Sequence, residues 1–169
     1  MTPKIINGGG DEWYTPRQYV DAALSVMGGI DLDPASHPVA SCWIDSHRYF
    51  TKEDDGLQHP WVGRIWLNPP YSQPAISMFV DKLISEFQNG NATEAICLTH
   101  SNSDTKWFHA LANSATCLCL TRGRIRFLFH GTDKKKAPTH GQCFFYYGPN
   151  KKRFTETFSA FGVCLSLAA

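Results

Sequence analysis

The sequence predicts one α/β domain with a mostly parallel sheet and an antiparallel part toward its carboxyl-terminal end. Short apolar stretches alternate with amphipathic helical patterns in the middle of the chain, which is typical of parallel sheets, and a run of short strands is expected in the last third. The 169 residues are 43% hydrophobic, so residues 1–169 can bury a single core of minimal size. Residues 1–10 are polar and glycine-rich, and we expect a flexible tail there.

The first helix is expected over Thr15–Gly28, with Thr15 as its cap and Pro16 in its first turn. Apolar residues recur at helical spacing at Val20, Ala23, Leu24 and Met27. A short buried strand follows at 30–33 and carries acids at its carboxyl end. Residues 34–60 are expected to be mostly irregular.

A second strand at 64–67 leads directly into the tetrapeptide Asn-Pro-Pro-Tyr, and Pro74 then opens the clearest helix, which ends at Asn89 and Gly90. The apolar stripe of this helix consists of Ile76, Phe79, Val80, Leu83, Ile84 and Phe87. The remaining predicted elements are a strand at 95–99, a helix at 104–113, and strands at 116–120, 124–129, 143–147 and 158–165.

The composition argues against several classes of protein. The six cysteines form no CxxC pair and several lie in apolar runs, which is typical of buried reduced thiols. The seven histidines show no metal-ligand spacing, so we expect no metal. No apolar run approaches the roughly 20 residues of a membrane span, so we expect a soluble, cytoplasmic protein without membrane contact.

Charge is distributed unevenly along the chain. The formal net charge is only +1, yet residues 1–60 carry nine acids against four bases, while residues 121–153 carry nine bases against one acid. A local basic region can bind a polyanion even in a near-neutral chain. The two regions are therefore expected to serve different ligands.

The strongest motif is Asn68-Pro69-Pro70-Tyr71, at the carboxyl end of a predicted strand, where open α/β sheets bind ligands. An aromatic amine is a poor nucleophile because its lone pair is delocalised. The Asn68 side-chain oxygen and the Pro69 carbonyl could accept its two hydrogens, Pro70 holds Pro69 extended, and Tyr71 offers a ring for stacking an extruded base. A plain strand-to-helix turn is the alternative interpretation of these four residues.

Together with four further motifs, this tetrapeptide resembles the small phage-type DNA N6-adenine methyltransferases. The other motifs are Trp13-Tyr14-Thr15-Pro16, Asp31-Leu32-Asp33-Pro34-Ala35-Ser36, Asp55-Gly56-Leu57 with Trp61, and Arg122-Gly123-Arg124-Ile125-Arg126-Phe127. The resemblance implies a Rossmann-like methyltransferase core, S-adenosylmethionine as methyl donor, duplex DNA with a flipped adenine as substrate, and a bacterial or phage-infected cell as the setting.

The resemblance also assigns a methyl-donor site. It implies that Trp13, Tyr14, Thr15 and Pro16 pack over the methionine end of the donor. Asp31, Asp33 and Pro34 resemble the first-strand motif, whose acid faces the donor's ammonium or an associated water. Asp55, or its neighbour Asp54, resembles the acid that accepts a hydrogen bond from the donor's adenine. A helix cap, a solvated loop and an exposed turn are the respective alternatives.

The sequence departs from the broader methyltransferase pattern after the first strand. No glycine occurs at residues 33–37, and only 35 positions separate Asp33 from Asn68, which is short for two further strand and helix units. No residue is therefore assigned to the donor's ribose.

The basic region has two parts that are candidates for DNA contact. Arg122, Arg124 and Arg126 alternate, so in a strand all three would share one face and could meet phosphates; a solvated edge strand is the alternative. A loop tip is expected at Lys134, Lys135 and Lys136, which could reach DNA or simply be a soluble hairpin.

Three functions are consistent with these patterns. The favoured function is adenine methylation in DNA, with base readout from the carboxyl-terminal third and possible help from a second subunit in a homodimer. A protein-amide methyltransferase acting on glutamine would use the same tetrapeptide, but the basic residues count against it. An inactive DNA-binding module of methyltransferase fold is the third candidate.

Overall fold

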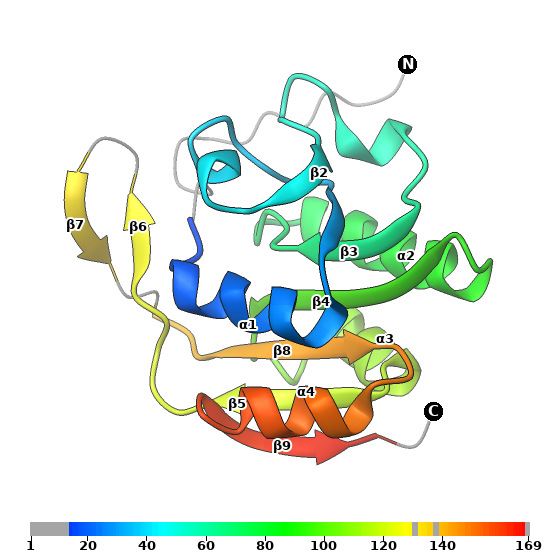
Figure 1. The fold of residues 1–169 in the computed structure, drawn as a ribbon, viewed down its shortest axis with the longest axis vertical. Coiled ribbons are helices and arrows are strands. Elements are labelled where there is room, and N and C mark those ends of the chain that lie inside the picture. The colour runs from blue at the N-terminus through cyan, green and yellow to red at the C-terminus, as the bar shows by residue number, and fades with distance from the viewer. Residues whose placement is uncertain (1–13, 130–131, 137–138, 168–169) are drawn as a thin grey trace.

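The computed structural model describes residues 14–129, 132–136 and 139–167. Its main sheet has seven strands in the order β2-β1-β3-β4-β8-β5-β9, with helices on both faces (Figure 1). The strands are β1 (Ile30–Asp33), β2 (Ser46–Tyr49), β3 (Gly63–Leu67), β4 (Ala92–His100), β5 (Cys117–Thr121), β8 (Gln142–Tyr147) and β9 (Gly162–Ser166). The helices are α1 (Arg17–Met27), α2 (Ala75–Gln88), α3 (Lys106–Ser114) and α4 (Lys151–Phe158), with 3-10 turns η1 (Ala40–Cys42) and η2 (Gly56–Gln58). A separate hairpin consists of β6 (Phe127–Phe129) and β7 (Thr132–Lys136).

The sheet is parallel in one half and antiparallel in the other, as the sequence predicted. β2, β1, β3 and β4 pair in parallel. β8 runs antiparallel between β4 and β5, and β9 is antiparallel to β5. The strands β1 to β5 therefore share one direction, and their carboxyl ends lie at one edge of the sheet, which we call the carboxyl edge.

Two apolar cores lie on opposite faces of this sheet. α1 and α4 pack on one face, and the strand residues there include Trp66, Ile96 and Phe144. α2 and α3 pack on the other face, and the strand residues there include their sequence neighbours Ile65, Cys97 and Phe145. Successive side chains along β3, β4 and β8 point to opposite faces of the sheet, so each of these strands contributes to both apolar cores.

The helix boundaries follow from local chemistry, with one correction. α1 ends where Gly28 adopts a left-handed conformation (φ 73°) and its amide bonds the Leu24 carbonyl, as expected for a glycine stop. The prediction that Thr15 caps this helix is wrong. Pro16 occupies the cap position, and the Thr15 hydroxyl bonds a distant side chain instead.

Two elements differ from the sequence prediction. β2 lies within residues 34–60, which were expected to be mostly irregular. Its side chains are mainly exposed and show no apolar alternation, so the sequence pattern did not indicate a strand. The strand predicted at 158–165 begins too early. The sequence prediction did not include α4, which continues to Phe158, and β9 begins only at Gly162. Phe154 and Phe158 lie four residues apart, stack at 4.5 Å and are fully buried, which is helical periodicity.

The basic segment is also built differently from the prediction. Residues 122–126 are not a strand, since β6 begins only at Phe127. The loop tip predicted at Lys134–Lys136 is wrong as well, because these residues belong to β7 and pair with β6. In Figure 1 the β6–β7 hairpin projects from the body of the molecule as an arm.

Other expectations concern buried thiols, membranes and metals. Cys97, Cys117, Cys119 and Cys143 are buried and form no disulfide. Within the described ranges, no helix is long and apolar enough to cross a membrane. In the same part of the chain, no cluster of three or more His, Cys, Asp or Glu side chains could hold a metal ion.

Candidate active site

The carboxyl edge brings together residues from three of the sequence motifs. Asp33 ends β1, Asn68 follows β3, and Arg122 follows β5. β1 and β3 are neighbours, but the chain first leaves β1 outward to β2 and then crosses back to β3. A reversal of this kind marks the usual ligand position in an open α/β sheet, and we call the region outside these two strand ends the crevice.

The Asn68 carboxamide is held at both ends. Its Nδ2 donates to Thr15 Oγ1 at 3.2 Å, and Tyr71 Oη donates to its Oδ1 at 2.6 Å. Asn68 is half-buried and Pro69 is buried. The side-chain oxygen therefore occupies a fixed position at the crevice and already accepts a hydrogen bond there.

The Tyr71 ring is part of an aromatic group at the carboxyl edge. It lies 4.0 Å from the His100 ring at the end of β4 and 6.4 Å from Phe127, centroid to centroid. His140 continues the group, 5.1 Å from His100 and nearly parallel to it. Burial raises the pKa of Tyr71 well above its ordinary value, so its hydroxyl remains a hydrogen-bond donor at all physiological pH values.

The segment before α1 is held by hydrogen bonds, one of which joins it to Asn68 at the end of β3. Tyr14 exchanges two backbone hydrogen bonds with Leu128 of the hairpin, at 3.2 and 2.9 Å. The Thr15 carbonyl accepts from Trp43 Nε1 at 3.0 Å, and Thr15 is buried. Trp13 lies outside the described residues. The Tyr14-Thr15-Pro16 motif thus connects the hairpin, the end of η1 and the Asn68-Pro69-Pro70-Tyr71 tetrapeptide.

Asp33 is a buried carboxyl at the crevice. Its side chain is 2% exposed, and burial raises its pKa to about 7. The Ala35 amide donates to it at 3.3 Å, and its backbone carbonyl accepts from Phe50. A carboxyl in this condition is close to half ionised at neutral pH and favours a cation nearby.

Asp31 is engaged elsewhere. It forms a bidentate ion pair with Arg64, with Nε–Oδ2 and Nη2–Oδ1 distances of 2.8 Å, and also accepts from the Arg64 amide. These Arg64 hydrogen bonds lower the pKa of Asp31 to about 2. His47 lies 3.4 Å away on β2. The two acids of β1 therefore have different partners, and only Asp33 lies at the carboxyl end of the strand.

Asp54 and Asp55 are exposed residues of the turn that contains η2. Asp54 accepts from the Thr51 amide and hydroxyl at 2.8 Å each, and these bonds lower its pKa. Asp55 adopts a left-handed conformation (φ 52°) and caps η2 by accepting from the Leu57 amide at 3.3 Å. Both carboxylates therefore already accept hydrogen bonds within the turn.

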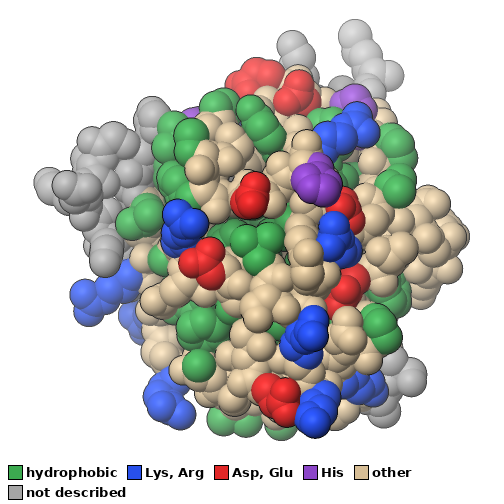
Figure 2. Space-filling view, in the orientation of Figure 1, with side chains coloured by type: hydrophobic (Ala, Val, Ile, Leu, Met, Phe, Trp, Pro, Cys, Tyr) green, Lys and Arg blue, Asp and Glu red, His purple; other side chains and the backbone are tan. Residues whose placement is uncertain are grey.

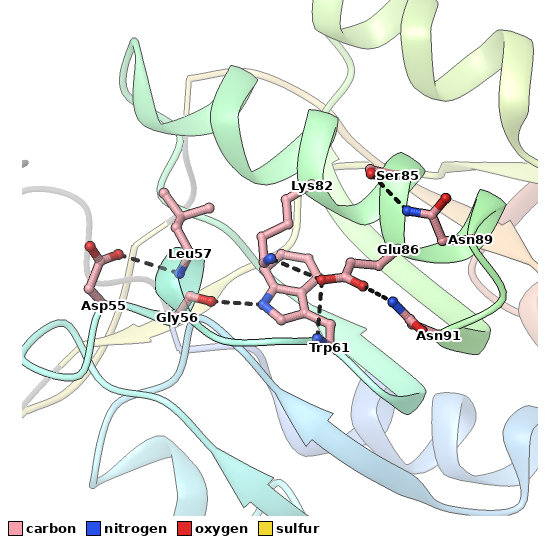
Figure 3. Close-up of polar contacts among 9 residues, drawn as sticks. All are labelled: Asp55, Gly56, Leu57, Trp61, Lys82, Ser85, Glu86, Asn89 and Asn91. Atoms are coloured by element: carbon pink, nitrogen blue, oxygen red, sulfur yellow. Dashed lines mark hydrogen bonds and ion pairs between the residues drawn. The ribbon is translucent and has the colours of Figure 1, made fainter. Parts of the chain in front are cut away.

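Gly56 places this turn against the end of β1. A Cβ at Gly56 would lie 2.0 Å from the Pro34 carbonyl oxygen, so no side chain fits between them. Trp61 Nε1 donates to the Gly56 carbonyl at 2.8 Å, and Glu86 of α2 accepts from the Trp61 amide (Figure 3). The Asp55 turn is thereby anchored beside Asp33 and Pro34.

Glu86 joins this anchor to α2. It accepts from Lys82 at 2.9 Å and from Asn91 at 2.7 Å, as Figure 3 shows. Burial acts to raise the pKa of Glu86, but the bonds from Asn91, Lys82 and Trp61 outweigh it, and that pKa lies below its ordinary value. Lys82 also lies over the Trp61 ring, 5.5 Å from its centroid.

The arginine segment keeps the predicted alternation although it is not a strand. Arg122, Arg124 and Arg126 are exposed, whereas Ile125 and Phe127 are buried. The backbone is tethered where Gln142 Oε1 accepts from the Ile125 amide at 2.7 Å and the Phe161 carbonyl accepts from the Arg122 amide at 2.7 Å. Three guanidinium groups therefore project from an anchored segment at the carboxyl edge.

The remaining bases divide into two groups. Lys134, Lys135 and Lys136 lie on β7 of the projecting hairpin. Lys151, Lys152 and Arg153 open α4, which follows the carboxyl end of β8 and so lies at the opposite edge of the sheet. In Figure 2 acidic and basic side chains are interspersed over the visible face, and Lys and Arg side chains gather at its left margin, below the grey atoms.

Sequence reasoning missed several residues at this edge. His100 ends β4 beside the tetrapeptide, and its strand-end position was the available signal. Trp43 and Gln142 act through long-range hydrogen bonds, for which the sequence carried no signal.

Comparison with known proteins identifies the family. A family model described as DNA N-6-adenine-methyltransferase (Dam) matches residues 3–159. The DNA N-6-adenine-methyltransferase of Haemophilus phage HP1 (strain HP1c1) is 34% identical over 130 residues, which cover 74% of this chain and 70% of that protein. The protein of the same name from Escherichia phage T1 is 33% identical over 102 residues, which cover 58% of this chain and 39% of that protein. The chain thus spans well under half of the phage T1 relative, but because the family model covers most of its length, it belongs to the DNA N-6-adenine-methyltransferase (Dam) family.

Proposed function

We propose that this chain transfers a methyl group from S-adenosylmethionine to adenine N6 in DNA, at the crevice between β1 and β3. The observation that carries the proposal is the Asn68 side-chain oxygen, which accepts from Tyr71 just after β3, at the same sheet edge where β1 ends with the buried Asp33. The strand order with its reversal between β1 and β3 fits a Rossmann-like methyltransferase core.

Asn68 and Pro69 would act on the target amine. Asn68 Oδ1 accepts the Tyr71 hydroxyl in this structure, so it can accept an N–H at the same position. With the Pro69 carbonyl as second acceptor, both amine hydrogens are held and the lone pair is turned toward the methyl group. A carboxamide is too weak a base to keep the proton released after transfer, which therefore passes to water.

Tyr71 would support the extruded base. Its ring already packs on His100, and adenine inside a duplex must leave the stack before its N6 can react. An aromatic ring compensates part of the lost base stacking. Tyr71 and Pro70 thus shape the pocket, while Asn68 and Pro69 provide the polar contacts.

The residues at the crevice fit the methyl donor that the family implies. S-adenosylmethionine, when bound, supplies a sulfonium methyl group as the electrophile. A buried carboxyl whose pKa is raised to about 7 is stabilised as an anion by a cation, so Asp33 fits the donor's ammonium. The donor would be surrounded by Pro34, Tyr14, Pro16 and the Asp54-Asp55 turn. The Asp31 carboxylate is already held in its ion pair with Arg64.

Duplex DNA would lie along the carboxyl edge. Arg122, Arg124 and Arg126 project there, and the lysines of β7 would extend the basic surface along the hairpin. Arginines of this kind bind phosphates and set the register of the protein on the duplex.

The proposal is tested by incubating the purified protein with tritiated S-adenosylmethionine and a mixed-sequence duplex, followed by nucleoside analysis of the DNA. Labelled N6-methyladenine in the wild type, and its loss in Asn68→Ala, is the expected result. Label on protein glutamine would instead indicate an amide methyltransferase, and DNA binding without label would indicate an inactive module.

A further inference from the structure

The Thr15 hydroxyl lies at an unexpected position for a residue of the donor-binding motif. Thr15 Oγ1 accepts from Asn68 Nδ2 at 3.2 Å across 53 positions of sequence. Its backbone carbonyl is occupied by Trp43, and the side chain is 1% exposed. The hydroxyl is therefore directed at the catalytic tetrapeptide.

The Asn68 carboxamide needs such a contact because its terminal torsion is intrinsically broad. In this structure the hydrogen bond from Tyr71 to Oδ1 and the hydrogen bond from Nδ2 to Thr15 both restrain it. An amine that enters the crevice can take the second lone pair of Oδ1 or replace the Tyr71 hydroxyl on that oxygen, and neither case changes the contact at Nδ2. The bond to Thr15 then remains to hold the plane of the carboxamide.

Thr15 is itself well placed to be a rigid partner. Threonine is β-branched and stiff about its first side-chain torsion. The preceding residue, Tyr14, is held by two backbone hydrogen bonds to Leu128, and Trp43 fixes the Thr15 carbonyl. The position of its hydroxyl is thus set by the hairpin and η1, independently of the loop that carries Asn68.

We infer that Thr15 is a positioning residue for methyl transfer: its hydroxyl holds Asn68 Nδ2, so that Oδ1 faces the target amine. The inference rests on the proposed role of Asn68. It gives the Thr15 side chain a task in the chemical step, distinct from the contact with the methyl donor that the sequence motif implies.

Thr15→Val and Thr15→Ser test this inference in single-turnover assays at saturating methyl donor and DNA. Valine has the shape of threonine but cannot accept a hydrogen bond. We expect Thr15→Val to lower the methyl-transfer rate about 3- to 10-fold, the range for one neutral hydrogen bond, with the dissociation constant for S-adenosylmethionine within twofold of wild type. Thr15→Ser keeps the hydroxyl and is expected to recover most of the rate.

The outcomes separate the inference from the proposed function. A wild-type rate in Thr15→Val, a rate loss explained by weaker donor binding, or a serine variant no better than valine would each overturn the role of Thr15. Full activity in Asn68→Ala would instead remove the role of Asn68 on which it rests. Thermal unfolding of each variant, expected to remain close to wild type, shows whether a lost rate comes from lost folding.

Discussion

At the end of β3 the proposed acceptor for the target amine is a carboxamide, which carries no charge and stays an acceptor at every physiological pH. It sits between a hydroxyl of the N-terminal motif and a hydroxyl of its own tetrapeptide. Its position is therefore determined by bonds rather than by packing alone. An acceptor fixed before the substrate arrives costs little reorganisation during the reaction.

Asn68→Ala tests the role of this acceptor. Because the side chain is half-buried and follows the strand, we expect folding and donor binding to stay nearly intact. Methyl transfer should fall by about 100- to 1000-fold, the loss typical of removing a preorganised polar contact in an active site. Single-turnover rates with labelled donor, together with a calorimetric titration of the donor, measure both quantities. Full activity would refute the mechanism.

Asp33→Asn tests the buried carboxyl. The pKa of Asp33 is raised from 3.8 to about 7, so its protonated form stabilises the unliganded fold below about pH 4, and this stability is lost as the pH rises through 7. We expect Asp33→Asn to remove this pH dependence, which amounts to about 2 to 3 kcal/mol between pH 5 and pH 8. Denaturant unfolding at pH 5 and pH 8 measures it.

The same variant has a second readout in methyl-donor binding. In the wild type, donor affinity should rise between pH 5.5 and 7, since the ionised carboxyl is the form that binds a cation. Asp33→Asn should bind the donor more weakly and without this rise, while DNA affinity changes little. Equal losses for donor and DNA would indicate that the carboxyl is only structural.

On the scale of elements, the end of β1 and the η2 turn form one unit. Gly56 packs on the Pro34 carbonyl, and Trp61 carries the contact to Glu86 of α2. The unit fixes where Asp54 and Asp55 lie relative to Asp33. A glycine follows Asp55 because the carbonyl of the strand end occupies the space of a Cβ.

Gly56→Ala tests this unit. The added methyl would lie 2.0 Å from a backbone oxygen, so the turn must move. We expect a loss of about 1 to 3 kcal/mol in unfolding free energy, typical of overpacking, and weaker methyl-donor binding. Gly90→Ala is the control, since its Cβ would meet nothing within 4 Å and its left-handed backbone affects stability only. Equal donor affinity in both variants would contradict the proposed donor position.

Elements with a clear apolar pattern could be predicted from the sequence, and the others could not. β3 and α2 carry apolar residues that lie in the core, and β1 contributes Ile30 to one core and Leu32 to the other. β2 has an exposed face and is held mainly by backbone pairing with β1, which leaves no trace in hydrophobicity. α4 contributes only two buried phenylalanines, and its end merges with the apolar run of β9.

On the scale of the whole molecule, the carboxyl edge could be expected from the strand and helix alternation, but its detailed contacts could not. The sequence identified Asp33 and Asn68 as strand-end features and suggested a strand for the arginine segment, and the fold gathers all three at one edge. The bond between Thr15 and Asn68 depends on how α1 enters the fold. No local pattern encodes that path, so the sequence suggested a helix cap instead.

The division of the basic residues is a property of the whole sheet as well. Nine bases cluster at residues 121–153 in the sequence, yet the reversed direction of β8 sends Lys151, Lys152 and Arg153 to the edge away from the crevice. Proximity in sequence therefore overstates the basic surface available to DNA at the active site. The arginine segment is the part at the carboxyl edge, and Lys134–Lys136 follow it in sequence on β7.

This division predicts different salt responses for two sets of arginines. If Arg122, Arg124 and Arg126 neutralise phosphates, replacing one with alanine should weaken DNA binding across many sequences and reduce the log-log salt slope by about one unit. Arg153→Ala is the matched control: it removes one exposed arginine at the opposite edge and should leave affinity and slope unchanged. Donor affinity should not change in any of these variants.

Methylation mapping of the same variants separates phosphate contact from base readout. An arginine that reads a guanine edge should, when replaced, relax the methylated sequence at one position, with a discrimination loss of about 1 to 3 kcal/mol. A phosphate contact lowers binding to all sequences alike and leaves the site unchanged. Wild-type affinity, salt slope and site choice in all three alanine variants would place the DNA on another surface, whereas a loss in Arg153→Ala equal to theirs would show that DNA binding is not confined to the carboxyl edge.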